Sequence, residues 1–359
     1  MRVLHITPRP LPDLRVERAI LSDNYNGFEV HLAAPGVSRT DLPIKLDGFH
    51  RLRFTLLDKA GFRISRRILK DIVRKVRPDV IHAHDFPAAY LAKGLAPIVY
   101  DAHEDRISTA YHRAYTKLSV MLGRLARLLR FIALEYAKLN LEAARDVVVV
   151  APSEGIVKRF LEAGAKKGFV LPNFPHRLEV PKLEIAIAKN VIHGAVDRPK
   201  YLLYAHKFPR RSPVEGFPKL FETGEFGKLV FVGGNIGRYE HVYRIDFVPH
   251  MRLYRIFRYF RTLLVPRKPY SGHRDISPNR VYTLSQVGAV PIIPYTLEQV
   301  KKYLPSSITF SSDEEFRQIL KDISSESPEE RLKRKEKIAR EAEKARRLDD
   351  VQKEAYKAA

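Results

Sequence analysis

The chain has 359 residues, enough for two domains with separate cores, because a single hydrophobic core stops growing near about 250–300 residues. It contains no cysteine, which excludes disulfides, a thiol nucleophile and zinc–thiolate sites. Its formal net charge of +23 requires an anionic partner; nucleic acid, anionic lipid and phosphorylated small molecules all remain open.

No apolar run approaches the roughly 20 residues of a membrane span, and the first residues form a short strand ended by prolines, unlike a signal peptide. We therefore expect a cytoplasmic protein. The absence of cysteine, the scarcity of glutamine and the 29% content of charged residues also suggest a thermophilic source.

Apolar runs and helical stretches alternate through the first half of the chain, which predicts a parallel α/β sheet. The predicted strands are 3–7, 28–33, 51–55, 80–83, 98–101, 147–151 and 169–171. The predicted helices are 65–76, 87–93, 110–144 and 153–163. Residues 175–198 show no clean period and are interpreted as the link between two domains.

A second α/β set follows this link. Its predicted strands are 201–205, 228–232, 244–248, 262–265, 290–293 and 307–310. Ser327, Pro328 and Glu330 form a capping-box pattern that predicts a charged helix running to about Arg347. The predicted domains are therefore 1–178 and 179–326, followed by a charged helical segment at 327–359 that either crosses back to the first domain or lies on the surface.

The most informative stretch begins at Asp275. Ser277 followed by Pro278 predicts a helix start, with serine as the N-cap and proline at the first helical position, and a helix that runs to about Gly288. Free N–H groups at a helix start favour anions, and Arg280 adds a second contact. The pattern indicates an anchored phosphate, most often carried by a nucleoside diphosphate.

Residues 277–282 followed by 288–293 resemble the nucleotide-sugar segment of the retaining group 4 glycosyltransferases, which have the GT-B fold. Further resembling segments occur in the family's order at 77–85, 99–104, 148–154 and 171–175. Two positions depart from the family pattern: Arg280 stands in place of lysine, and Thr283 in place of the second glutamate of a Glu-x7-Glu pair. Asp275 stands at the first position of that pair.

This resemblance implies two Rossmann-like domains facing across a cleft, and transfer of a sugar from a nucleoside-diphosphate sugar with retention at the anomeric carbon. It implies no bound metal and no cofactor other than the donor. His103 is the predicted catalytic residue, acting as a polar contact at the reaction centre, and His84 and Asp85 are predicted on the acceptor side. The predicted donor-binding residues are Lys207, Arg210, Arg211, Gly233, Asp275, Ser277, Pro278, Asn279, Arg280 and Thr283.

His82 and His84 alternate along one strand and so point to the same face. A His-x-His pair suits a metal, but the sequence shows no further ligand set beside it. A metal site is therefore not predicted.

Basic residues gather on one side of the predicted helix 110–144 and of the few residues that precede it. At about 100° per residue they span an arc of roughly 140°. The predicted membrane contacts among them are Arg113, Lys117, Arg124, Arg127 and Arg130. A basic amphipathic helix favours docking on an anionic membrane near a lipid-linked glycan or other envelope acceptor; the alternative is a core helix with an arginine-rich solvent face.

Two other classes of protein remain. Thr283, and the proline-rich loop 8–12 in place of the family's glycine-rich loop, fit an inactive GT-B relative that serves as a partner subunit or binding protein. The charge fits a nucleic-acid-binding protein, although no recognised nucleic-acid motif occurs.

Overall fold

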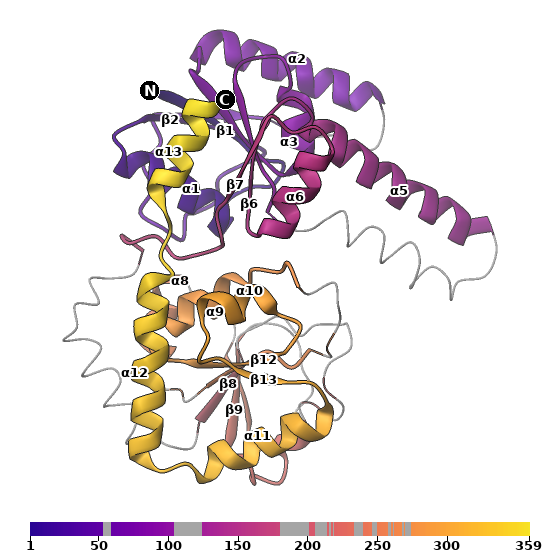
Figure 1. Ribbon diagram of the computed structural model, residues 1–359. Helices are drawn as coiled ribbons and strands as arrows, with labels where there is room; N and C mark the ends of the chain where they lie inside the picture. Colours follow the sequence, from indigo (N-terminus) through magenta and orange to yellow (C-terminus); the bar gives the residue numbers. More distant parts are fainter. Residues whose placement is uncertain are drawn as a thin grey trace. The chain divides into compact units, whose positions relative to one another are not determined.

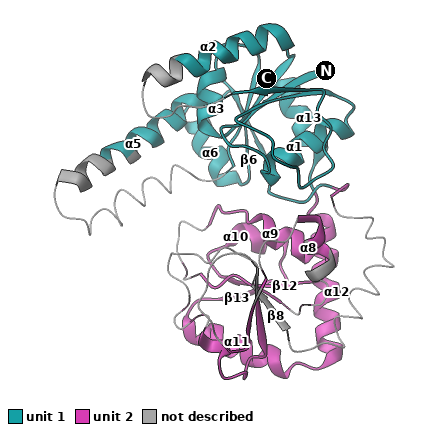
Figure 2. Ribbon diagram, turned by 180° about the vertical axis from the view of Figure 1, so that it is seen from behind, with its two compact units in different colours: residues 1–176, 347–359 teal, residues 177–346 magenta. Residues whose placement is uncertain are grey.

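The chain forms two compact units in the computed structural model (Figure 2). Unit 1 contains residues 1–176 and 347–359, and unit 2 contains residues 177–346. The predicted charged segment 327–359 is thus divided, because its last residues return to unit 1. The structure describes residues 1–52, 59–103, 124–179, 201–204, 214, 217, 219–232, 240–245, 250–257, 260, 262–267, 269 and 274–359.

Unit 1 is built on a seven-stranded sheet with the order β3-β2-β1-β4-β5-β6-β7. Neighbouring strands pair in parallel, and β1 lies between β2 and β4. From β1 the sheet adds β2 and β3 on one side, and then β4 to β7 on the other side. The boundary between β1 and β4 is therefore the topological switch point, where α/β sheets place ligands. The strands are β1 (Arg2–Ile6), β2 (Glu29–Ala34), β3 (Gly48–Arg51), β4 (Val80–His84), β5 (Ile98–Asp101), β6 (Val148–Ala151) and β7 (Lys167–Val170).

Helices cover both faces of this sheet (Figure 1). One face packs the larger core against α2, α3, α5 and α6. On the other face, Val80, Val99 and Val148 pack against Ala355 and Tyr356 of the last helix. The helices of unit 1 are α1 (Leu14–Tyr25), α2 (Lys59–Val76), α3 (Asp85–Ala92), α5 (Arg124–Ala144), α6 (Glu154–Glu162) and α13 (Asp349–Ala358).

Helix α1 was not predicted from the sequence. Asp13 caps it by accepting a hydrogen bond from the backbone N–H of Arg15 at 3.1 Å. Its charged residues Arg15, Glu17, Arg18 and Asp23 are buried. Such residues normally mark a solvent-exposed face, so the apolar periodicity that indicates a helix is absent from this segment.

Unit 2 contains a six-stranded parallel sheet with the order β10-β9-β8-β11-β12-β13, the same winding as in unit 1. Its strands are β8 (Tyr201–Tyr204), β9 (Lys228–Val232), β10 (Val242–Ile245), β11 (Thr262–Leu264), β12 (Val290–Pro294) and β13 (Ile308–Phe310). Its helical segments are η2 (Lys219–Phe221), α8 (His250–Phe257), α9 (Asn279–Ser285), α10 (Glu298–Tyr303), α11 (Asp313–Ser325) and α12 (Pro328–Lys344). Phe221, Leu264, Ile292, Phe310 and Phe316 lie in its core.

The predicted capping box is confirmed at the start of α12. Ser327 accepts from the backbone N–H of Glu330, and the Glu330 carboxylate accepts from the backbone N–H of Ser327 at 2.9 Å. Two strands begin earlier in the chain than predicted: β3 pairs with β2 through residues 48–51, and β10 pairs with β9 through residues 242–245. Residues 53–55 and 246–248 of the predicted strands lie outside the described residues. Partner register, which a single apolar run does not reveal, fixes both positions.

Glu17 provides a test of stability against pH. Its carboxylate accepts from the N–H groups of Asp41 and Leu42, each at 2.7 Å, and burial raises its pKa from 4.5 to about 7 against the effect of these bonds. Because the folded pKa is the higher one, the contribution of Glu17 to stability is present below about pH 4.5 and is lost as the pH rises to about 7.

As the pH rises from about 4.5 to about 7, we therefore expect the free energy of unfolding of Glu17→Gln to increase relative to that of the unmodified chain. The expected increase is on the order of 1–2 kcal/mol. Urea unfolding at several pH values measures the difference. The exposed variant Glu162→Gln is the matched control, and equal pH dependence in both variants would contradict the expectation.

Candidate functional site

Polar side chains gather in unit 1 at the carboxyl ends of β1, β4 and β5, beside the switch point. They come from strands that are distant in sequence and from α1, and all but His103 are almost completely buried. The set consists of His5, Arg15, Asp23, His82, His84, Asp101 and His103. Such a concentration of buried polar groups is costly unless each is paired, so their partners define the site.

Arg15 and Asp101 form a buried ion pair in this set. Arg15 Nε lies 3.0 and 3.1 Å from the two carboxylate oxygens, and its Nη1 donates to the Leu171 carbonyl and to Asn173 Oδ1. Burial by itself would raise the pKa of Asp101. The charge of Arg15, with the nearby imidazoles of His82 and His84, outweighs the effect of burial and holds that pKa well below its usual range. Asp101 is therefore an anion with its charge already compensated.

The predicted catalytic residue His103 lies next to this pair. Its Nε2 is 3.0 Å from His84 Nδ1 and 3.7 Å from Asp101 Oδ2. His103 is 9% exposed, whereas His84 and Asp101 have no exposed surface. Burial lowers the pKa of His84 well below its ordinary value and that of His82 to about 4, so these imidazoles are neutral near pH 7.

The two predicted acceptor-side residues follow one another at the end of β4. His84 is fully buried and contacts His103, so it would act on a ligand through His103. Asp85 begins α3 with a φ of +63° and is 3% exposed. A non-glycine residue in this left-handed region is strained, which is typical of a residue held by its surroundings at a functional turn.

Two sets of donor atoms among the described residues are close enough to hold a metal ion. They are His5, His82 and His84, and His84, Asp101 and His103, with the donor atoms of each set within 4.8 Å of one another. The nitrogens His5 Nδ1 and His84 Nε2 are 3.0 Å apart and share a hydrogen bond, which a metal would have to replace. Sequence analysis missed this set because His5 is remote in the chain.

The structure corrects the predicted start of α9. The helix begins at Asn279, Pro278 occupies the N-cap with an extended ψ of 115°, and there is no side-chain cap. Ser277 lies just before the helix and is 5% exposed. Arg280 lies in the first turn and Thr283 is buried on the same helix. Because α9 has seven residues and ends at Ser285, Arg280 is a stronger basis for anion binding than the helix terminus.

Several predicted site residues lie outside the described residues. These are Lys207, Arg210, Arg211, Gly233, Arg113 and Lys117. The backbone of Arg124, Arg127 and Arg130 is described as part of α5, but their side chains are not.

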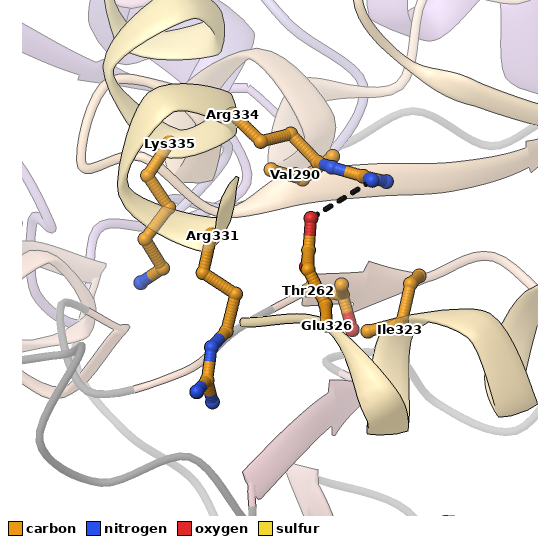
Figure 3. A pocket seen from close by; sticks show the side chains of 7 residues that line it. All are labelled: Thr262, Val290, Ile323, Glu326, Arg331, Arg334 and Lys335. Carbon is orange, nitrogen blue, oxygen red and sulfur yellow. Dashed lines mark ion pairs between the residues drawn. The ribbon is translucent and has the colours of Figure 1, made fainter. Parts of the chain in front are cut away.

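A small pocket in unit 2 lies between α11, α12 and the sheet (Figure 3). Thr262, Ile323, Arg331 and Lys335 are among its lining residues, and Glu326 pairs with Arg334 across it at 2.8 Å. Its volume is about 10 Å³, which is the space for one water molecule. This pocket is too small for a sugar or a nucleotide.

Comparisons with known proteins identify the fold. Residues 24–174 match the family described as Glycosyltransferase Family 4. No curated protein matches the sequence significantly. Among solved structures, WaaG, a glycosyltransferase involved in lipopolysaccharide biosynthesis, is similar with a TM-score of 0.68 at 12% identity, covering 99% of this chain and 98% of that chain.

Two further structures are similar over almost their whole length. Sucrose-phosphate synthase from Thermosynechococcus elongatus has a TM-score of 0.66 at 12% identity, with 98% of this chain and 96% of that chain covered. Anabaena Alr3699/HepE, in complex with UDP and glucose, has a TM-score of 0.63 at 12% identity, with 99% and 98% covered.

These likenesses confirm the predicted class, an α/β protein of GT-B architecture with two Rossmann-like domains. The family match over residues 24–174, together with the shared fold, confirms the resemblance found in the motifs of the chain. The match contains His84, Asp101 and His103 but begins after His5 and Arg15.

The Arg15–Asp101 pair provides a second test. We expect Arg15→Met to lower the free energy of unfolding of unit 1 by about 3–5 kcal/mol, because it leaves a carboxylate buried without its cation. The double variant Arg15→Met/Asp101→Asn should recover part of the loss, since it removes the uncompensated charge. Chemical denaturation followed by circular dichroism measures both, and an equal loss in the two variants would contradict the expectation.

Proposed function

We propose that this protein is a retaining glycosyltransferase that moves a sugar from a nucleoside-diphosphate sugar to an acceptor. The family match and the GT-B fold support the reaction class. The observation that carries the proposal is the position of His103, partly exposed at the carboxyl edge of the sheet and anchored by neutral His84 beside the compensated Asp101. UDP-glucose is the first donor to test, because the similar HepE is known in complex with it.

The roles proposed for the residues follow from their chemistry. His103 contacts the sugar through its imidazole. Asp101 has its charge engaged by Arg15 and is unsuited to nucleophilic attack, in keeping with a family that retains configuration without a carboxylate nucleophile. Arg280, with Lys207, Arg210 and Arg211, offsets the charge of the departing diphosphate. Asp275, Ser277, Asn279 and Thr283 remain predicted contacts of the donor.

Kinetic and binding measurements distinguish the role proposed for His103 from the role proposed for Arg280. We expect His103→Asn to lower kcat by about 10²–10⁴-fold with little change in UDP affinity, because the lost contact is at the reacting sugar. Arg280→Ala should weaken UDP binding by about 10–100-fold, the value of one charged hydrogen bond. Calorimetric titration with UDP, GDP, ADP and dTDP, followed by donor turnover, measures both; Arg340→Ala, at an exposed position of unit 2, is the control.

Thr283 favours the second candidate function, an inactive relative that binds a partner. The family's glutamate is absent at this position, and the threonine side chain is buried at 1% exposure. Absence of binding to all four nucleotides, with no turnover of UDP-glucose, would exclude the transferase and leave this reading.

We further propose that unit 1 docks on the anionic cytosolic face of a membrane, near a lipid-linked glycan or envelope acceptor. Among the described residues, no helix combines the length and apolar character needed to span a bilayer. On the outer face of α2, Ile64 is 62% exposed and Ile68 39%, beside exposed Arg67 and Lys70. Exposed apolar side chains within a basic surface are the pattern of an interfacial helix.

Helix α5 adds to this surface. Phe131 and Ile132 are 62% and 52% exposed, and both α2 and α5 pack against α3. Figures 1 and 2 show the amino-terminal part of α5 extending beyond the sheet.

Vesicle sedimentation tests the docking. We expect Arg67→Glu/Arg74→Glu to reduce partitioning onto phosphatidylserine-containing vesicles by tenfold or more, at about 1 kcal/mol for each basic residue near the surface. The control Lys45→Glu/Lys158→Glu makes the same charge change at exposed positions elsewhere in unit 1. Equal partitioning of both variants, or binding that is indifferent to anionic lipid, would remove the membrane from the proposal.

A further inference from the structure

Three donor atoms from two neighbouring strands converge at the carboxyl edge of the sheet in unit 1. His84 ends β4 and is the register partner of Asp101, which ends β5, and His103 follows two residues later. His84 Nδ1 lies 3.0 Å from His103 Nε2 and 3.4 Å from Asp101 Oδ2, and His103 Nε2 lies 3.7 Å from the same oxygen. Two imidazole nitrogens and one carboxylate oxygen therefore face one another.

The distances to the carboxylate oxygen fit ligands of one ion better than they fit hydrogen bonds. An N–H···O hydrogen bond spans about 2.7–3.2 Å between its heavy atoms, and both imidazole nitrogens lie farther than this from Asp101 Oδ2, at 3.4 and 3.7 Å. Where metal–ligand bonds are about 2.0–2.2 Å long, neighbouring ligand atoms are about 2.9–3.6 Å apart in six-coordinate and four-coordinate geometries. The spacing of the three donor atoms nearly coincides with this range.

The chemistry of the three donors selects the class of ion. Two imidazoles with one carboxylate are the protein ligands of several zinc sites, where a further position holds water or substrate. The same set with more open positions binds ferrous iron. Magnesium and calcium prefer sites made of oxygen atoms. The donor set therefore favours a divalent transition-metal ion.

Outer partners hold the ligands in place, as they usually do around a bound metal ion. When His84 Nδ1 binds the ion, His84 Nε2 donates to His5 Nδ1 at 3.0 Å, and His5 Nε2 donates to Asp23 Oδ2 at 2.8 Å. Arg15 holds the other oxygen of Asp101, with Nη2 at 2.5 Å and Nε at 3.0 Å from Oδ1. Arg15 Nε also donates to Oδ2 at 3.1 Å, which leaves that oxygen a second lone pair for the ion.

The other possible metal set among the described residues, His5, His82 and His84, is less suitable. Its three side chains have no exposed surface, whereas His103 is 9% exposed and gives an ion access from the edge of the sheet. It contains no carboxylate to offset the charge of the ion. An ion there would also replace the hydrogen bond between His5 and His84, which serves as an outer contact in the first set.

We propose that His84 Nδ1, Asp101 Oδ2 and His103 Nε2 bind one divalent transition-metal ion, with Zn²⁺ as the first candidate. Each neutral imidazole then carries its proton on the ring nitrogen that does not face the ion. Water or a hydroxyl group completes the coordination. Only one consequence rests on the proposed function, namely that the ion fixes the imidazole of His103 beside the reacting sugar.

A titration with Co²⁺ tests the site in the full chain without donor or acceptor. Co²⁺ bound by four or five ligands absorbs visible light much more strongly than the hexaaqua ion does. After treatment with EDTA and its removal, we expect the protein to bind one Co²⁺ per chain in the strongly absorbing form. An equal amount of Zn²⁺ should displace it. Absence of this absorption, with no Zn²⁺ binding by calorimetry, would overturn the proposal.

Substitutions distinguish ligands from neighbours. We expect His103→Asn to lower Zn²⁺ affinity by more than about 100-fold, because loss of an outer partner alone costs about 10–100-fold. His5→Gln should show that smaller loss. His82→Asn is the matched control: its ring stacks on His84 with centroids 4.4 Å apart but is not a ligand, so affinity should be retained. Equal losses in His82→Asn and His103→Asn, or full affinity in His103→Asn, would contradict the assigned set.

Two further measurements keep the decision independent of variant stability. X-ray absorption at the zinc edge of the wild-type protein should show two imidazole ligands and oxygen; three imidazoles would overturn the assignment in favour of the other set. His31 and His50 lie 3.3 Å apart in a second, less buried pair, so loss of binding in His50→Asn would place the ion there instead. Failure of sugar transfer would leave the metal result intact, and absence of metal binding would leave the proposed transferase standing.

Discussion

The arrangement of unit 1 depends on the buried pair between Arg15 and Asp101. Three imidazoles approach the same carboxylate oxygen, those of His82, His84 and His103, at 3.5, 3.4 and 3.7 Å. An uncompensated carboxylate at this place would draw protons onto the histidines around it. Because Arg15 balances Asp101, burial can keep His82 and His84 neutral while their rings stack against one another.

The end of the chain completes the far side of the same site. Gln352 and Tyr356 of α13 bond to Asp23, more than 300 residues earlier in the sequence, and Arg347 donates to Ser22. The apolar side of α13 covers one face of the sheet in unit 1. A single short helix therefore contributes both to the core and to the polar cluster, which links the stability of the unit to the geometry around His103.

The polar cluster of unit 1 contains residues from inside and outside the segment that matches the family. His84, Asp101 and His103 lie within the matched residues 24–174, whereas His5, Arg15 and Asp23 precede them and Tyr356 follows them. A fold supports many functions, so the residues of this cluster, and not the fold, are the basis of the proposed function.

The sequence by itself indicated the alternation of strands and helices and the resemblance to the group 4 glycosyltransferases. Apolar runs located β5 and β9 with their observed bounds, and local capping chemistry located the start of α12, because these signals come from neighbouring residues. It failed for α1, whose charged residues are buried, and for the start of α9, where Pro278 and not Ser277 occupies the N-cap. Only the tertiary structure brought His5, Asp23 and α13 to His103, because parallel strands and a returning helix join residues that no local pattern connects.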